Sequence, residues 1–133
     1  MNDDTEIIRQ LGESIRISAS VMYLNAQSNV EARRYVFSYT ISISNNGKEN
    51  ARLLNRHWLI TDADGRVQEV HGEGVIGEQP DIAPGDTHTY TSGTIIETPV
   101  GSMEGRYGMV SASGIQFDAQ IPVFRLAVPG VLN

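Results

Sequence analysis

The amino-acid sequence predicts an all-β protein, an antiparallel β-sandwich of seven or more strands. Apolar and polar side chains alternate with a period of two through most of the chain, which is typical of strands that bury one face. Turn-forming residues recur at intervals of about ten residues between these segments. We expect no helix beyond a short turn near the N-terminus. These three observations favour two packed sheets over a helical architecture.

The first two expected strands show the alternation most clearly. In SIRISASVMYL (residues 14–24), apolar side chains alternate with arginine and serine. In RRYVFSYTISIS (residues 33–44), five aromatic or β-branched side chains share one face: Tyr35, Phe37, Tyr39, Ile41 and Ile43. These residue types favour strands because they pack well on a pleated, half-buried surface.

Two turn signals predict how the next strands pair. Asn46-Gly47 is typical of a tight hairpin, so we expect the strand ARLLNRHWLIT to return antiparallel beside residues 33–44. Asp64-Gly65 predicts a second hairpin, which brings back RVQEVHG. The sequence therefore predicts a meander of three consecutive strands.

The C-terminal half continues the pattern. Pro84-Gly85 occupies the centre of an expected type II turn, and the strand THTYTSGTII follows it. SMEGRYGMV and IQFDAQI are expected to form a hairpin around the turn SASG. Because Pro122 lacks the N–H that a strand ladder needs, the last strand is expected to be bulged there or to run along a sheet edge.

Length and composition indicate one domain, residues 1–133, with a partly ordered N-terminal segment at residues 1–14. The absence of cysteine excludes disulfides and thiolate chemistry. A net charge of −6 with ten lysines and arginines disfavours nucleic-acid binding, for which a basic surface is needed. No segment has the composition of a signal peptide or a membrane span, so we expect a cytoplasmic protein that makes no membrane contact.

Four segments carry a family resemblance: YVFSYTISISNNG, RLLNRHWLITDADGRVQEVHGEGVIGEQPDIAPGDTHTYTSGT, ETPVGSMEGRYGMV and IPVFRLAVP. Together they resemble the bacterial ApaG family from about Ile15 to Pro129. The resemblance implies an immunoglobulin-like or fibronectin type III-like sandwich, and Trp58 is similar to the core tryptophan of such sheets. It also implies a domain used for protein contacts in F-box and polymerase-delta-interacting proteins, and a connection with cobalt sensitivity and magnesium efflux. It implies no catalytic residue.

Three glycines have the spacing of a dinucleotide-binding loop: Gly72, Gly74 and Gly77. A Rossmann site needs a helix directly after such a loop, and the two prolines that follow exclude one. The glycines therefore indicate a bulged strand end that crosses between the two sheets. An alternative is an anion-binding nest of backbone N–H groups, assisted by Arg56 or Arg66.

A metal site is a second hypothesis. If Asp64-Gly65 closes its hairpin, His57 and His71 lie nearly opposite each other, with Glu69 and Glu73 close in sequence. Two imidazoles and a carboxylate are suitable ligands for a divalent metal. A register shift of one residue would separate the two rings, and the histidines would then be ordinary strand residues.

No catalytic constellation is present, so we expect a protein that is not an enzyme and that needs no cofactor. The sequence favours a protein-interaction module whose partner is another protein of unknown identity or a second copy in a homodimer. The alternative is a sensor that binds a phosphorylated anion or a metal ion at the sites above.

Overall fold

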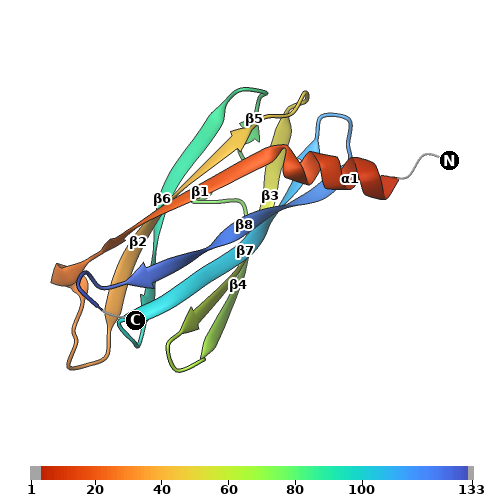
Figure 1. Cartoon of the computed structure of the whole chain (residues 1–133). Coiled ribbons are helices and arrows are strands. Elements are labelled where there is room, and N and C mark those ends of the chain that lie inside the picture. The colour runs from red at the N-terminus through yellow and green to blue at the C-terminus, as the bar shows by residue number, and fades with distance from the viewer. Residues whose placement is uncertain (1–3, 132–133) are drawn as a thin grey trace.

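The computed structural model describes residues 4–131 and confirms the antiparallel β-sandwich (Figure 1). In chain order the elements are α1 (Asp4–Glu13), β1 (Ile15–Tyr23), the 3-10 turn η1 (Asn25–Gln27), β2 (Tyr35–Asn45), β3 (Ala51–Asp62), β4 (Val67–Glu73), β5 (Asp81–Ile82), β6 (Thr87–Ile96), β7 (Val100–Ser111) and β8 (Gln116–Ala127). Residues 1–3 and 132–133 of the predicted domain lie outside the described residues. No helix in the described part is long and apolar enough to cross a membrane.

The two sheets differ in width. One sheet has the order β1-β2-β6, and the other has the order β4-β3-β7-β8, with the short β5 also pairing with β3. On one side of the sandwich the edge strands β1 and β8 lie beside each other (Figure 1). On the opposite side the edges belong to β4 and β6. The arrangement leaves two unpaired strand edges facing the same side of the molecule.

Trp58 lies at the centre of the core between the sheets and is 2% exposed. Tyr39 from the facing sheet, and Tyr107 and Phe124 from the same sheet, meet the indole edge to face, at centroid distances of 5.5, 6.3 and 5.8 Å. Such contacts add to the free energy gained by burying the rings. The other fully buried large side chains come mostly from β2, β3 and β7: Phe37, Ile41, Ile43, Leu53, Met103 and Met109.

The predicted hairpin at Asn46-Gly47 is wrong. β2 pairs with β1 and β6, whereas β3 lies in the other sheet, so the chain crosses between sheets here. The buried Asn45 side chain holds this crossing: its Nδ2 donates to the carbonyls of Glu49 and Ile82, both at 2.8 Å, and its Oδ1 accepts from the Gly47 N–H at 2.9 Å. The predicted meander is therefore reduced to its second hairpin, β3 and β4.

The N-terminal segment forms a ten-residue helix instead of the short turn expected for residues 1–14. Arg9 pairs with Glu6 and Glu13, one helical turn away on either side. Such pairs support a short exposed helix. Leu11 packs against the core, and a side chain at Gly12 would meet the Asp118 carbonyl of β8 at 2.6 Å. Contact with β8 thus adds tertiary support to a helix that these ion pairs already favour.

The expectation for Pro122 is confirmed in both forms. β8 is an edge strand. Its pairing with β7 is also bulged at Pro122: Ile121 pairs with Gly105 and Phe124 pairs with Met103, so the register shifts between these two pairs. On the other side of β7, Gly105 is paired with Trp58. A Cβ atom added at Gly105 would lie 2.0 Å from the carbonyl oxygen of His57, so only glycine fits.

We expect Gly105→Ala to destabilise the fold by about 3 kcal/mol, because the added methyl group collides with backbone rather than with a movable side chain. The measurement is the free energy of unfolding from urea titration. Gly93→Ala is the control, because its Cβ would lie 3.3 Å from the nearest atom, the Phe37 carbonyl oxygen. Equal losses in the two variants would contradict the steric explanation.

We expect Asn45→Ala to lower the free energy of unfolding by roughly 2 kcal/mol or more, because the carbonyls of Glu49 and Ile82 lose their donor. Asn46→Ala, at the exposed neighbouring position, is expected to change it by less than about 0.5 kcal/mol. Thermal unfolding of both variants tests the difference. If Asn45→Ala melted like the native chain, the crossing would not depend on this side chain.

Candidate functional site

A cleft of about 570 Å³ opens between the sheets on the side where β4 and β6 form the edges. Its lining includes Phe37 and Tyr39 from β2, Trp58 and Ile60 from β3, and Val70 from β4. Leu24, Val36, Gly93 and Ile95 also line it, and its polar lining residues are Gln27, Arg34, Arg56, Gln68, Ser92 and Thr94. One hydrogen bond spans the two edges, from Gln68 Nε2 to the carbonyl of Ile95 at 3.2 Å. An apolar cleft with a few polar groups is the usual form of a binding site.

The charged residues that line the cleft are both arginines. Arg56 is half-buried, and its Nη1 donates to the carbonyls of Glu73 and Gly74, each at 3.0 Å. Arg34 is exposed, and its guanidinium makes no hydrogen bond or ion pair with any described residue. No carboxylate lines the cleft, although the whole chain has a net charge of −6. The cleft is thus a basic site on an acidic protein.

Three polar groups of core aromatic residues belong to this part of the molecule, two phenol hydroxyls and one indole N–H. The hydroxyls of Tyr90 and Tyr107 are hydrogen-bonded to each other and connect β6 with β7, that is, one sheet with the other. Burial raises the pKa of both phenols, so both stay neutral at physiological pH. The indole N–H of Trp58, a cleft residue, has no hydrogen-bond partner within residues 4–131.

The three glycines lie beside β3 and do not cross between the sheets, because β4 and β5 on either side of them both pair with β3. The expected bulge is not seen in the β3–β4 pairing, which keeps one register up to Glu73; instead the chain turns at Val75–Glu78, where Gly74 and Gly77 have φ values of 59° and 73°. The crossing to the other sheet occurs later, at the Pro84-Gly85 turn between β5 and β6. No helix follows the glycines, as expected.

An anion-binding nest needs backbone N–H groups in this loop that have no partner within the protein. The N–H groups of Gly74, Val75 and Glu78 donate to backbone carbonyls. Arg56 packs so closely on Gly72 that an added Cβ would lie 2.6 Å from its guanidinium. Arg66 pairs with carboxylates at the opposite end of β4, including Glu97 at 3.1 Å. These groups therefore have partners within the protein.

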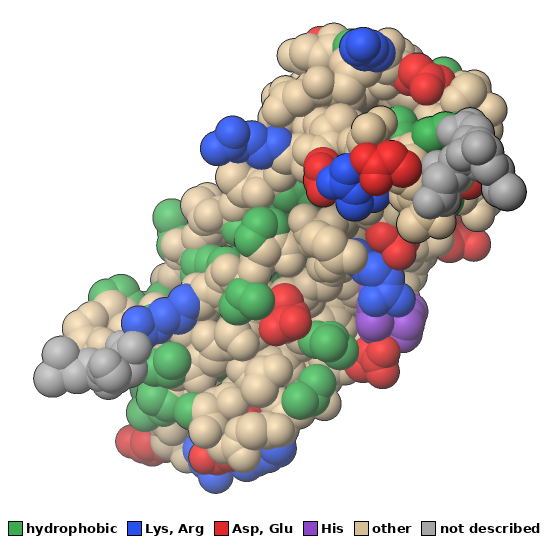
Figure 2. Space-filling view, turned by 45° about the vertical axis from the view of Figure 1, so that its right-hand side comes forward, with side chains coloured by type: hydrophobic (Ala, Val, Ile, Leu, Met, Phe, Trp, Pro, Cys, Tyr) green, Lys and Arg blue, Asp and Glu red, His purple; other side chains and the backbone are tan. Residues whose placement is uncertain are grey.

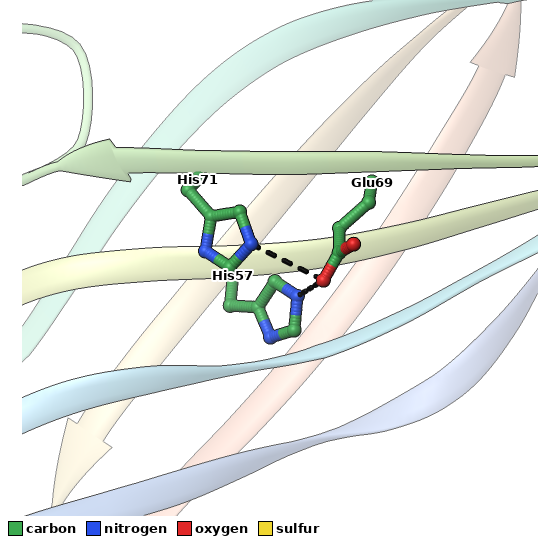
Figure 3. A group of neighbouring side chains, drawn as sticks. All are labelled: His57, Glu69 and His71. Carbon is green, nitrogen blue, oxygen red and sulfur yellow. Dashed lines mark hydrogen bonds and ion pairs between the residues drawn. The ribbon is translucent and has the colours of Figure 1, made fainter.

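The Asp64-Gly65 hairpin forms in the predicted register and brings His57 directly opposite His71. Their rings stack at a centroid distance of 4.1 Å and an interplanar angle of 11°. The Nε2 atoms lie 2.6 Å (His57) and 3.1 Å (His71) from the same carboxylate oxygen of Glu69 (Figure 3). The predicted neighbour Glu73 is not part of this group, and His88 is on the other sheet.

Within this cluster, the carboxyl group of Glu69 has a pKa that differs from its ordinary value. Its hydrogen bonds, first from His57 and then from His71, hold the pKa of the carboxyl below its ordinary value. A lowered pKa in the folded state means that these contacts stabilise the fold above the ordinary carboxyl pKa. That contribution is lost as the pH falls through the lowered value.

Comparison with known proteins identifies the family. The family model described as the ApaG domain matches residues 25–111. The chain is 60% identical to Protein ApaG of Ectopseudomonas mendocina over 119 residues, covering 90% of this chain and 94% of that protein. It is 58% identical to Protein ApaG of Pseudomonas aeruginosa with the same coverage. The chain belongs to the ApaG family.

Two solved structures show the same fold as this ApaG-family chain. An X-ray structure of the Northeast Structural Genomics Consortium target SoR45 matches with a TM-score of 0.88 and 52% identity, over 92% of both chains. A crystal structure of a protein named ApaA from Bordetella pertussis matches with a TM-score of 0.86 and 45% identity, over 88% of this chain and 95% of that one. ApaG membership brings no known enzyme class with it.

We expect His57→Phe to raise the pKa of Glu69 toward its ordinary value, because the aromatic stack is kept while the stronger hydrogen bond is lost. The carboxyl carbon shift of Glu69 in an NMR pH titration measures it. His71→Phe is expected to raise the pKa less, and His88→Phe to leave it unchanged. If the pKa of Glu69 were the same in His57→Phe as in the native chain, the hydrogen bond from His57 would not be the cause of the lowered pKa.

Proposed function

We propose that this ApaG-family protein is a non-catalytic protein-interaction module whose cleft between β4 and β6 receives an extended segment of a partner protein. The observation that carries the proposal is the charge of the cleft. Two arginines and no carboxylate line an apolar cavity in a protein of net charge −6. We infer that the partner segment has apolar side chains together with at least one carboxylate.

The two strand edges support an extended occupant. β4 and β6 are each the last strand of a sheet, so each has a backbone edge that no described strand covers. An extended peptide can add to such an edge through main-chain hydrogen bonds, while its alternate side chains enter the neighbouring pocket. The apolar lining residues that solvent reaches are Leu24, Val70 and Ile95, and they provide the apolar surface for that pocket.

Arg34 provides specificity in this proposal. Its guanidinium is exposed and has no described partner, so a ligand carboxylate meets no competing internal ion pair. Bidentate hydrogen bonds between arginine and a carboxylate are directional and stronger than neutral ones. The connection with cobalt and magnesium homeostasis that the family resemblance implies stays a prediction.

A displayed library of random peptides, selected on the purified chain, is expected to enrich peptides that combine apolar residues with an acidic one. Arg34→Glu is expected to weaken binding of the selected peptides at least tenfold, because a hydrogen bond to a charged group contributes about 1.5–3 kcal/mol. Fluorescence anisotropy with labelled peptides measures the affinity. Ser92→Trp, which fills the cleft from β6, is expected to abolish binding.

Each variant has a matched control. Arg16→Glu makes the same change of charge on an exposed position of β1, outside the cleft, and Thr91→Trp adds the same ring at the exposed position next to Ser92. Both controls are expected to bind like the native chain. If selected peptides bound Ser92→Trp normally, or if Ser92→Trp instead dissociated a dimer of the native chain in sedimentation, the proposed occupant would be wrong.

A further inference from the structure

The outer face of the β3–β4 hairpin carries a cluster that the cleft does not use. His57, Glu69 and His71 each offer one ligand atom, and these atoms lie within 4.8 Å of one another. Trp58 and Ile60, which alternate with His57 along β3, line the cleft on the inner side of the same strand. Figure 2 shows histidine side chains at the molecular surface, next to acidic and basic groups.

We propose that His57, Glu69 and His71 form a binding site for a divalent transition-metal ion such as Zn²⁺. When the ion binds, each imidazole gives up its Nε2–H hydrogen bond to Glu69 and carries its ring proton on Nδ1, which frees the Nε2 lone pair for the ion; Glu69 binds through its carboxylate. Two imidazoles and one carboxylate suit Zn²⁺, and solvent or a partner group completes the coordination. Mg²⁺ and Ca²⁺ prefer oxygen ligands and are expected to bind far more weakly.

The fold places these donors before any ion arrives. His57 and His71 are a directly opposed cross-strand pair, so the backbone register fixes how close their rings can be. Both Nε2 atoms are directed at one oxygen of Glu69, which means that the three donor groups converge on one point (Figure 3). The His57 side chain is only 14% exposed, which restricts its motion.

The register of this hairpin is itself strongly fixed. The buried carboxylate of Asp62 accepts hydrogen bonds from the N–H groups of Asp64 and Arg66, at 2.9 and 3.0 Å. Gly65 takes a φ of 85°, which favours glycine. A slip of one residue would lose these contacts and separate the histidines. The turn therefore maintains the spacing of the donors.

The charges around the cluster are compatible with a cation. Arg106 on β7 lies opposite His57 of β3 in the strand register. The Nε atom of Arg106 is 3.8 Å from the Asp118 carboxylate on β8, and this carboxylate offsets the charge of the arginine. Glu73 and Glu104 are exposed on the neighbouring positions of β4 and β7. The outer face near the cluster thus has more carboxylates than basic groups.

The test uses the full chain, freed of metal with a chelator and titrated with ZnCl₂. Imidazole ¹⁵N NMR is expected to show the Nε2 signals of His57 and His71 shifting together and saturating at one ion per chain, while His88 does not respond. Isothermal titration is expected to show that His57→Phe, His71→Phe and Glu69→Gln each weaken binding at least tenfold. MgCl₂ in place of ZnCl₂ is expected to shift neither histidine.

Two controls separate this site from general metal binding. His88→Phe and Glu73→Gln remove a histidine and a carboxylate outside the cluster, and both are expected to bind Zn²⁺ within twofold of the native chain. The proposal is overturned if ZnCl₂ leaves the His57 and His71 signals in place, or if it shifts all three histidines to the same extent. The first readout needs no variant, so a misfolded variant cannot hide the answer.

Discussion

The burial of Trp58 between two sheets of unequal width is the constraint on which the rest of the structure depends. The indole contacts aromatic rings from both sheets, and the glycine beside it on β7 leaves room for the strand backbones to approach. One sheet ends at β6 and the other continues to β4. Because the indole fixes the sheets at their centre while β4 and β6 are not paired, the interior stays open at that side. The cleft is a consequence of this geometry.

Local chemistry determined which parts of the fold the sequence could predict. The Asp64-Gly65 turn is specified by residues within the turn itself, so the β3–β4 hairpin and its register were predictable. Asn46-Gly47 looks equally like a hairpin, but Asn45 uses its side chain to bind Glu49 and the distant Ile82. A contact across 37 residues leaves no local signal. Helix α1 was underestimated although its sequence carries a local signal, the spacing of Glu6, Arg9 and Glu13 for ion pairs along one helix face.

Of the two candidate sites, the histidine cluster was predictable from local sequence and the cleft was not. The pair of His57 and His71 followed from one turn and the period of a strand, and the convergence of both rings on Glu69 was suggested by proximity in sequence. The cleft was not predictable, since Arg34, Gln68 and Ser92 come from separate elements and look like ordinary polar strand or loop residues. Only the arrangement of the two sheets shows that their side chains meet.

Strand β3 places Arg56 and Trp58 on the inner side of the sheet and His57, between them, on the outer side. These three residues are consecutive, so the cleft wall and the stacked imidazoles share one stretch of backbone. A substitution that moved this backbone would displace groups on both sides of the sheet. Variants made for one face are therefore best confined to side-chain changes that leave the β3 backbone in place.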